Sequence, residues 1–182
     1  MTWHPLFIFA PLLTLLLWVA VVDLRHRRIP NTLTLAIAVT GLMQSFTAAA
    51  TVSPSQSFLG LLTGLALTLV LFALGAIGGG DVKLIAAAGT WTGPQFVFQI
   101  FLAAAIVGMI IVLAQAAWQG RLRKLFRNTG LLLINLIHIR ELGADHTQAT
   151  GLSCRSVDKP LPYAVPFLIA TVTLLLTGQG IL

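Results

Sequence analysis

Charged residues are scarce in this chain, and their absence from long stretches excludes an ordinary soluble domain. Only 9% of the 182 residues are Asp, Glu, Lys or Arg, against about 25% in soluble domains. No charge occurs in residues 1–22, 29–80, 84–120 or 160–182, and the mean hydropathy is +0.94. Apolar runs of this length are typical of helices that cross a membrane. The sequence therefore predicts an all-α, polytopic membrane protein with one domain over residues 1–182.

Cysteine is almost absent as well. The single residue, Cys154, excludes a disulfide within the chain and a CxxC metal site. No combination of Ser, His and Asp, or of Cys and His, stands out as a nucleophilic site. We therefore expect no metal site and no thiol chemistry.

The basic residues are distributed unevenly along the chain. A pI of about 10.8 would suggest a nucleic-acid partner for a soluble protein, but a membrane chain offers another explanation. With six crossings, all eleven Lys and Arg fall on one face, which the positive-inside rule makes cytoplasmic, with the N- and C-termini outside. We expect no nucleic-acid partner, and expect the basic loop at about 119–160 to attract anionic lipids. The six apolar segments are Leu6–Val22, Leu33–Thr51, Phe58–Ile77, Val82–Thr92, Gln95–Trp118 and Leu161–Thr177.

The fourth apolar segment, Val82–Thr92, is too short to cross a bilayer by itself. As a helix it would rise about 16 Å, whereas the hydrocarbon core is about 30 Å thick. The three glycines at 78–80 precede it and can form irregular backbone, which a membrane tolerates only where protein or a wet cavity covers it. We expect this segment to start inside the bilayer, with Asp81 below the headgroups.

Two of the five acidic residues, Asp23 and Asp81, stand at the edges of apolar segments, where a carboxylate is costly. In the structural interpretation, Asp23 pairs with a neighbouring arginine and Asp81 caps the following helix. In the chemical interpretation, two close carboxylates share one proton and activate water against a peptide bond. Spacing alone leaves both interpretations open.

Three motifs carry a family resemblance. Residues 23–31 read Asp-Leu-Arg-His-Arg-Arg-Ile-Pro-Asn, residues 78–84 read Gly-Gly-Gly-Asp-Val-Lys-Leu, and residues 161–166 read Leu-Pro-Tyr-Ala-Val-Pro. Their order and spacing resemble the aspartate, GxGD and proline-aromatic motifs of the type IV prepilin peptidases. One departure is Ala164, which stands where glycine is usual.

The resemblance implies a multi-pass aspartyl protease of the bacterial inner membrane that cuts the leader from prepilins or pseudopilins at the cytoplasmic face, without metal or other cofactor. Asp23 and Asp81 match the catalytic pair. The residues that match supporting motif positions are Pro30, Asn31, Gly78, Gly80, Lys83, Pro162 and Tyr163. Many members also carry a CxxC insert and methylate the product. This chain lacks that insert and resembles the compact tight-adherence (Flp) peptidases, so we do not expect methylation.

Two other functions are compatible with acids at membrane edges. One is a small proton-coupled transporter or channel, although no internal repeat of the kind common in transporters is present. The other is a non-catalytic subunit of a pilus or secretion machine.

For the peptidase, helix dipoles favour Asp81 as the ionised base and Asp23 as the protonated acid. The natural substrate, its cleavage sequence and the oligomeric state are left open.

Overall fold

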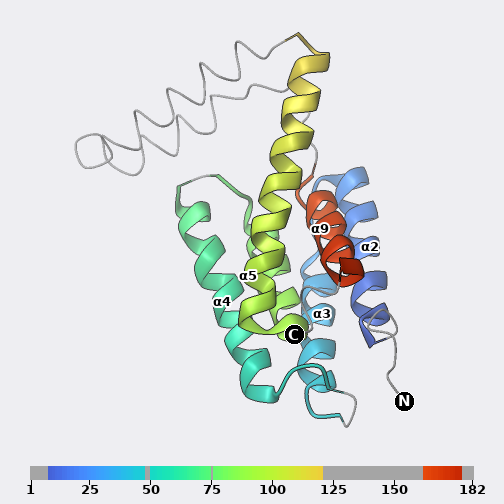
Figure 1. The fold of residues 1–182 in the computed structure, drawn as a ribbon, viewed down its shortest axis with the longest axis vertical. Helices are drawn as coiled ribbons and strands as arrows, with labels where there is room; N and C mark the ends of the chain where they lie inside the picture. Colours follow the sequence, from blue (N-terminus) through green and yellow to red (C-terminus); the bar gives the residue numbers. More distant parts are fainter. Residues whose placement is uncertain (1–7, 48–49, 75, 121–161, 178–182) are drawn as a thin grey trace, which may run out of the picture.

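The computed structural model describes residues 8–47, 50–74, 76–120 and 162–177, and this part of the chain is helical without strands (Figure 1). The predicted cytoplasmic loop lies outside the described residues from residue 121 onward. The helices are α2 (Ala10–His26), α3 (Asn31–Gln44), α4 (Pro54–Ala73), α5 (Gly79–Trp118) and α9 (Ala164–Thr177). They pack along one another in a bundle, which confirms the predicted all-α class.

The end of α2 and the start of α4 differ from the predicted apolar segments, because local backbone interactions determine where these helices end and begin. Helix α2 continues past the apolar run to His26 and ends at Arg27, whose left-handed backbone (φ 52°) breaks the helix. Asp23 therefore lies within the last turn of α2. Helix α4 starts four residues before the predicted segment (Phe58), because the Ser53 and Gln56 side chains form a capping box and Pro54 occupies the first turn.

Helix α5 consists of two helical segments that reverse direction at Gly93. The predicted break at Gly93-Pro94 is confirmed, since Gly93 has a non-helical backbone with φ 73°, a conformation that glycine adopts without steric cost. The start of α5 lies near the end of α2, whereas Phe96, just after the break, contacts Phe9 near the start of α2. The two segments therefore run in opposite directions along the bundle (Figure 1).

The first segment of α5 forms the centre of the bundle. Every residue from Leu84 to Gly93 is buried. Helices α3, α4 and α9 all pack against α5. This burial explains how a segment too short to cross a bilayer is accommodated, because neighbouring helices rather than lipid surround it.

Small residues, among them Gly60 and Gly64 on α4, allow α4 and α5 to approach closely. A Cβ placed on Gly60 would overlap the backbone carbonyl of Gly89, and one on Gly89 would overlap that of Gly60. The Ser57 hydroxyl also donates a 2.6 Å hydrogen bond to the carbonyl oxygen of Thr90 across this interface. Contacts of this kind are typical of helices packed within membranes.

Within the part of the chain that the structure describes, α4 and α5 are long and apolar enough to cross a membrane, and α9 is a shorter apolar helix. Large apolar side chains are exposed along α4, among them Phe58, Leu62 and Leu69. Such a continuous apolar surface suits lipid contact better than water.

Candidate active site

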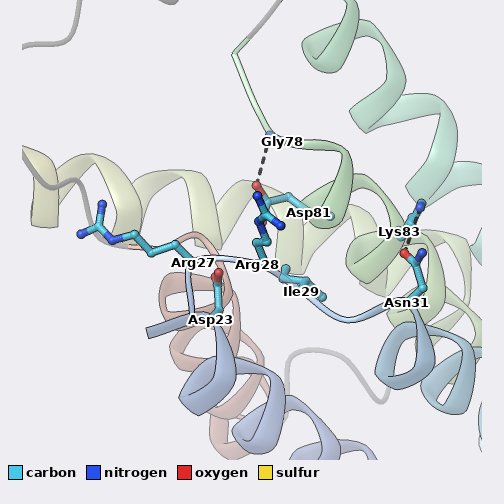
Figure 2. Close-up of a pocket in the computed structure, with 9 residues that line it drawn as sticks. Asp23, Arg27, Arg28, Ile29, Asn31, Gly78, Asp81 and Lys83 are labelled. Carbon is cyan, nitrogen blue, oxygen red and sulfur yellow. Dashed lines mark hydrogen bonds between the residues drawn. The ribbon is translucent and has the colours of Figure 1, made fainter. Parts of the chain in front are cut away.

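A pocket of about 310 Å³ lies where the α2–α3 connection meets the start of α5, and it contains both aspartates (Figure 2). The two residues are far apart in the sequence, and the reversal of the chain through α3 and α4 brings them together. Four of the seven supporting residues also line the pocket. The full lining is Asp23, Arg27, Arg28, Ile29, Asn31, Gly78, Gly80, Asp81 and Lys83.

Asp23 reaches the pocket from the last turn of α2, with only 6% of its surface exposed. Its backbone carbonyl accepts a 2.8 Å hydrogen bond from the N–H of Arg27, the residue with the left-handed backbone. Outside glycine that conformation carries an energetic cost of about 1–2 kcal/mol. It turns the chain sharply after Asp23, so that the following residues cross toward α5.

Asp81 sits in the first turn of α5, where its Oδ2 accepts a hydrogen bond of 3.2 Å from the N–H of Gly78 (Figure 2). The expectation that Asp81 caps a helix beginning at Val82 is wrong in that form, because α5 begins at Gly79 with Gly78 as its N-cap. Asp81 is the third helical residue and caps the helix by accepting the Gly78 N–H. This cap does not exclude chemistry, because it uses one carboxylate oxygen. A backbone N–H donor and a helix N-terminus both stabilise negative charge at this position.

Gly80 provides the close approach between the two halves of the site. A Cβ at this position would lie 3.2 Å from Cβ of Ile29 and 3.5 Å from its Cγ1. The α2–α3 connection can therefore rest directly on the first turn of α5. Ile29 was not predicted as a site residue, although its place in the aspartate motif, two residues before Asn31, is the signal that could have identified it.

Lys83 and Asn31 join the two halves on the rim of the pocket. The Lys83 ammonium group donates a 3.0 Å hydrogen bond to Oδ1 of Asn31 (Figure 2). This contact links the first turns of α5 and α3, which carry the two motifs. Both supporting residues thus have an observed partner, namely each other.

Replacing Lys83 with methionine is expected to lower the activity of this site by about 3- to 10-fold, while the melting temperature falls by less than about 3 °C, because exposed polar pairs contribute about 0–1 kcal/mol. Asn31→Ala should give a similar loss. The double variant should lose no more than either single variant, since both remove one interaction. Additive losses, measured as kcat/KM for the four proteins, would show that the two side chains act separately.

The other three supporting residues do not line the pocket. Pro30 precedes α3 in extended backbone. Pro162 and Tyr163 form the turn that opens α9, where their carbonyl oxygens accept hydrogen bonds from the N–H groups of Val165 (3.3 Å) and Phe167 (3.2 Å).

The electrostatic contacts of the pocket do not single out one acid as the charged one. Asp81 accepts the Gly78 N–H, as the dipole argument requires, but Asp23 shares the pocket lining with the cationic Arg27 side chain. The two carboxyl groups line the same pocket. We therefore treat them as one pair that titrates together.

The described residues contain no group of three or more His, Cys, Asp or Glu side chains that could hold a metal ion. The pocket offers two carboxylates, the Gly78 N–H and three cationic side chains.

The fold and the site define a class: a helical protein with membrane-capable helices and an acid pair at one end of the bundle. Within that class, residues 10–113 match the type IV leader peptidase family, and the chain belongs to this family. The match covers more than half of the chain, includes α2 to most of α5, and contains both aspartate motifs.

Two curated relatives carry the printed name prepilin leader peptidase/N-methyltransferase. The protein from Pectobacterium carotovorum subsp. carotovorum is 36% identical over 120 residues, which cover 62% of this chain and 41% of the relative. The protein from Burkholderia pseudomallei strain 1026b is 33% identical over 114 residues, covering 59% and 37%. The chain thus matches about two fifths of each relative's length. No solved structure matches.

Proposed function

We propose that this protein is a membrane aspartyl endopeptidase that removes the leader peptide from prepilin-like substrates, with Asp23 and Asp81 as its catalytic pair. One observation carries the proposal: both aspartates line a single pocket, held together by Gly80 against Ile29. Membership of the leader peptidase family supports the same reaction.

In the proposed reaction, one carboxylate of the pair is ionised and the other is protonated. The ionised group removes a proton from water as the water oxygen bonds to the carbonyl carbon of the substrate. The protonated group donates its proton to the carbonyl oxygen, which gives a tetrahedral diol. The diol then collapses: the amide nitrogen gains a proton, the C–N bond breaks and a carboxylic acid and an amine are released. The sequence-based assignment of Asp81 as base is retained as a proposal, within a pair that shares one proton.

We propose further that the chain crosses the bacterial inner membrane six times, with the pocket at the cytoplasmic side and both termini outside. The six crossings would be α2, α3, α4, the two segments of α5, and α9. Arg27, Arg28 and Lys83 line the pocket, so the positive-inside rule supports this orientation. A prepilin obeys the same rule, with its basic leader in the cytoplasm, and its cleavage point would then meet the two acids.

We propose the peptidase activity without the methyltransferase activity that the relatives' names include. The family's CxxC pairs would require four cysteines, and this chain has one. Flp-type pilins and pseudopilins are the proposed substrates. Anionic lipids are proposed to contact the basic face.

The purified protein in lipid vesicles is expected to cleave an Flp-type prepilin once, at the end of its basic leader. Mass spectrometry of both products would locate the cut, and N-terminal analysis would show an unmethylated amine even when S-adenosylmethionine is supplied. An intact substrate under these conditions would contradict the proposal. A methylated product would contradict only the absence of the second activity.

The rate of cleavage is expected to follow a bell-shaped pH profile. Below the lower pKa of the pair, both carboxyl groups are protonated and no base is available; above the higher pKa, both are ionised and no acid is available. The measurement is kcat/KM for the prepilin across pH. A profile with a single limb would contradict the use of two carboxyl groups.

A further inference from the structure

The pocket that holds the two acids carries more positive than negative charge. Three cationic side chains, those of Arg27, Arg28 and Lys83, line it together with the two carboxyl groups. Because the proposed resting pair shares one proton, the two acids contribute about one negative charge. The pocket then has a net charge of about +2. The attack of water on an uncharged peptide bond does not require this excess, so the cations need another role.

Arg28 is the cation best placed to contact a group bound between the acids. Figure 2 shows its side chain running from the α2–α3 connection toward Asp81, whereas the side chain of Arg27 extends away from Asp81. Lys83 already donates one of its three N–H groups to Asn31, in a hydrogen bond of 3.0 Å. The guanidinium group of Arg28 has five N–H donors in one plane, an arrangement that matches the two oxygens of a carboxylate.

The proposed reaction leaves a carboxylate in this pocket. The carbonyl carbon that water attacks must lie between Asp23 and Asp81, and the same carbon becomes the carboxyl carbon of the released leader. This new C-terminus is ionised at neutral pH, because an α-carboxyl group has a pKa of about 3.3–3.7. The product and the ionised acid of the pair would then repel each other, and the cations of the lining are the groups that offset this repulsion.

We propose that Arg28 binds the carboxylate at the new C-terminus of the cleaved leader, which makes the leader a product inhibitor that occupies the site until it dissociates. A guanidinium group and a carboxylate form two parallel, charge-assisted hydrogen bonds. Arg27 and Lys83 add positive charge to the same pocket. The intact substrate presents an uncharged carbonyl group at this point, so Arg28 stabilises the bound product more than the bound substrate. This inference rests on the proposed peptidase function.

Two synthetic leader peptides of an Flp-type prepilin test the proposal, one with a free C-terminal carboxylate and one with a C-terminal amide. They differ only in the group that Arg28 is proposed to bind. We expect the wild-type protein in lipid vesicles to bind the acid about 5- to 20-fold more tightly than the amide. Arg28→Gln should remove most of this difference and change KM for prepilin by less than about twofold. Equal binding of the two peptides by the wild type, or an equal rise of KM and of the acid's dissociation constant in Arg28→Gln, would overturn the proposal.

Arg25→Gln is the matched control, because Arg25 is exposed in the last turn of α2 and is not part of the pocket lining. This variant removes one positive charge near the site and should keep the wild-type preference for the acid. If it loses that preference as Arg28→Gln does, the peptide responds to the general charge of this face and the proposed site is wrong. Peptide binding needs no turnover, whereas failure to cleave prepilin would overturn the peptidase proposal itself, so the two failures are distinguishable.

Discussion

Replacing either Asp23 or Asp81 with asparagine is expected to reduce prepilin cleavage by at least about 1,000-fold, because each step of the proposed reaction needs one group that takes a proton and one that gives it. Asparagine has nearly the same size but does neither. The two losses should not add, since a pair that works as a unit fails when one member is missing. The measurement is single-turnover cleavage of purified prepilin by each single variant and by the double variant.

Both single variants are expected to stay folded, so a loss of cleavage would not reflect unfolding. Asp81→Asn keeps a side-chain oxygen that can accept the Gly78 N–H, so the capped first turn of α5 should survive. Asp23→Asn replaces a buried, protonated carboxyl group by a neutral amide of nearly the same size, and it should leave the melting temperature unchanged or higher. Asp158→Asn, a carboxylate outside the motif, is the matched control and should cleave at the wild-type rate. If both single variants still process prepilin, the two acids are not the catalytic pair. That result would favour the hypotheses of a proton-coupled transporter or a non-catalytic subunit.

The sequence predicted the acid pair but not what holds it together. Apolar runs and helix-breaking residues such as Gly93 and Pro94 are local signals, and they predicted the positions of the helices and the reversal in α5. Asp23 and Asp81 stood out because a carboxylate at an apolar edge is costly wherever the chain folds. The contact of Ile29 with Gly80 depends instead on how two distant segments pack, and a single sequence does not encode that in any local pattern.

The same reasoning explains the partial success at the supporting residues. Asn31 and Lys83 were selected from motif resemblance alone, and the structure supplies the physical relation between them as a hydrogen bond. Tyr163 was selected in the same way, yet its unpaired hydroxyl is visible only in three dimensions. The dipole argument for Asp81 considered one helix at a time, so it could not include the burial of Asp23, which depends on the elements that pack around it.

Gly60→Ala and Gly89→Ala are each expected to destabilise the protein by about 3 kcal/mol or more, at the upper end of overpacking effects. The added methyl group would meet backbone rather than a movable side chain. At Gly60 it would also lie 2.9 Å from the carbonyl carbon of Gly93, so α4 and the first segment of α5 must separate where these residues meet. The melting temperature should fall by about 6–12 °C, and thermal denaturation in detergent would measure this.

Gly108→Ala is the matched control for these variants, because it lies in the second segment of α5 and its added methyl group would come no closer than 3.8 Å to Pro166. Alanine is the better helix former by about 1 kcal/mol, so this variant should be as stable as the wild type or more so. Activity should follow stability at Gly60 and Gly89, since α4 packs against the same segment of α5 that presents Asp81 at its start. A Gly89→Ala protein with wild-type melting and cleavage would mean that the close approach of α4 does not position the acid pair, and that the contact between Ile29 and Gly80 is sufficient to hold it.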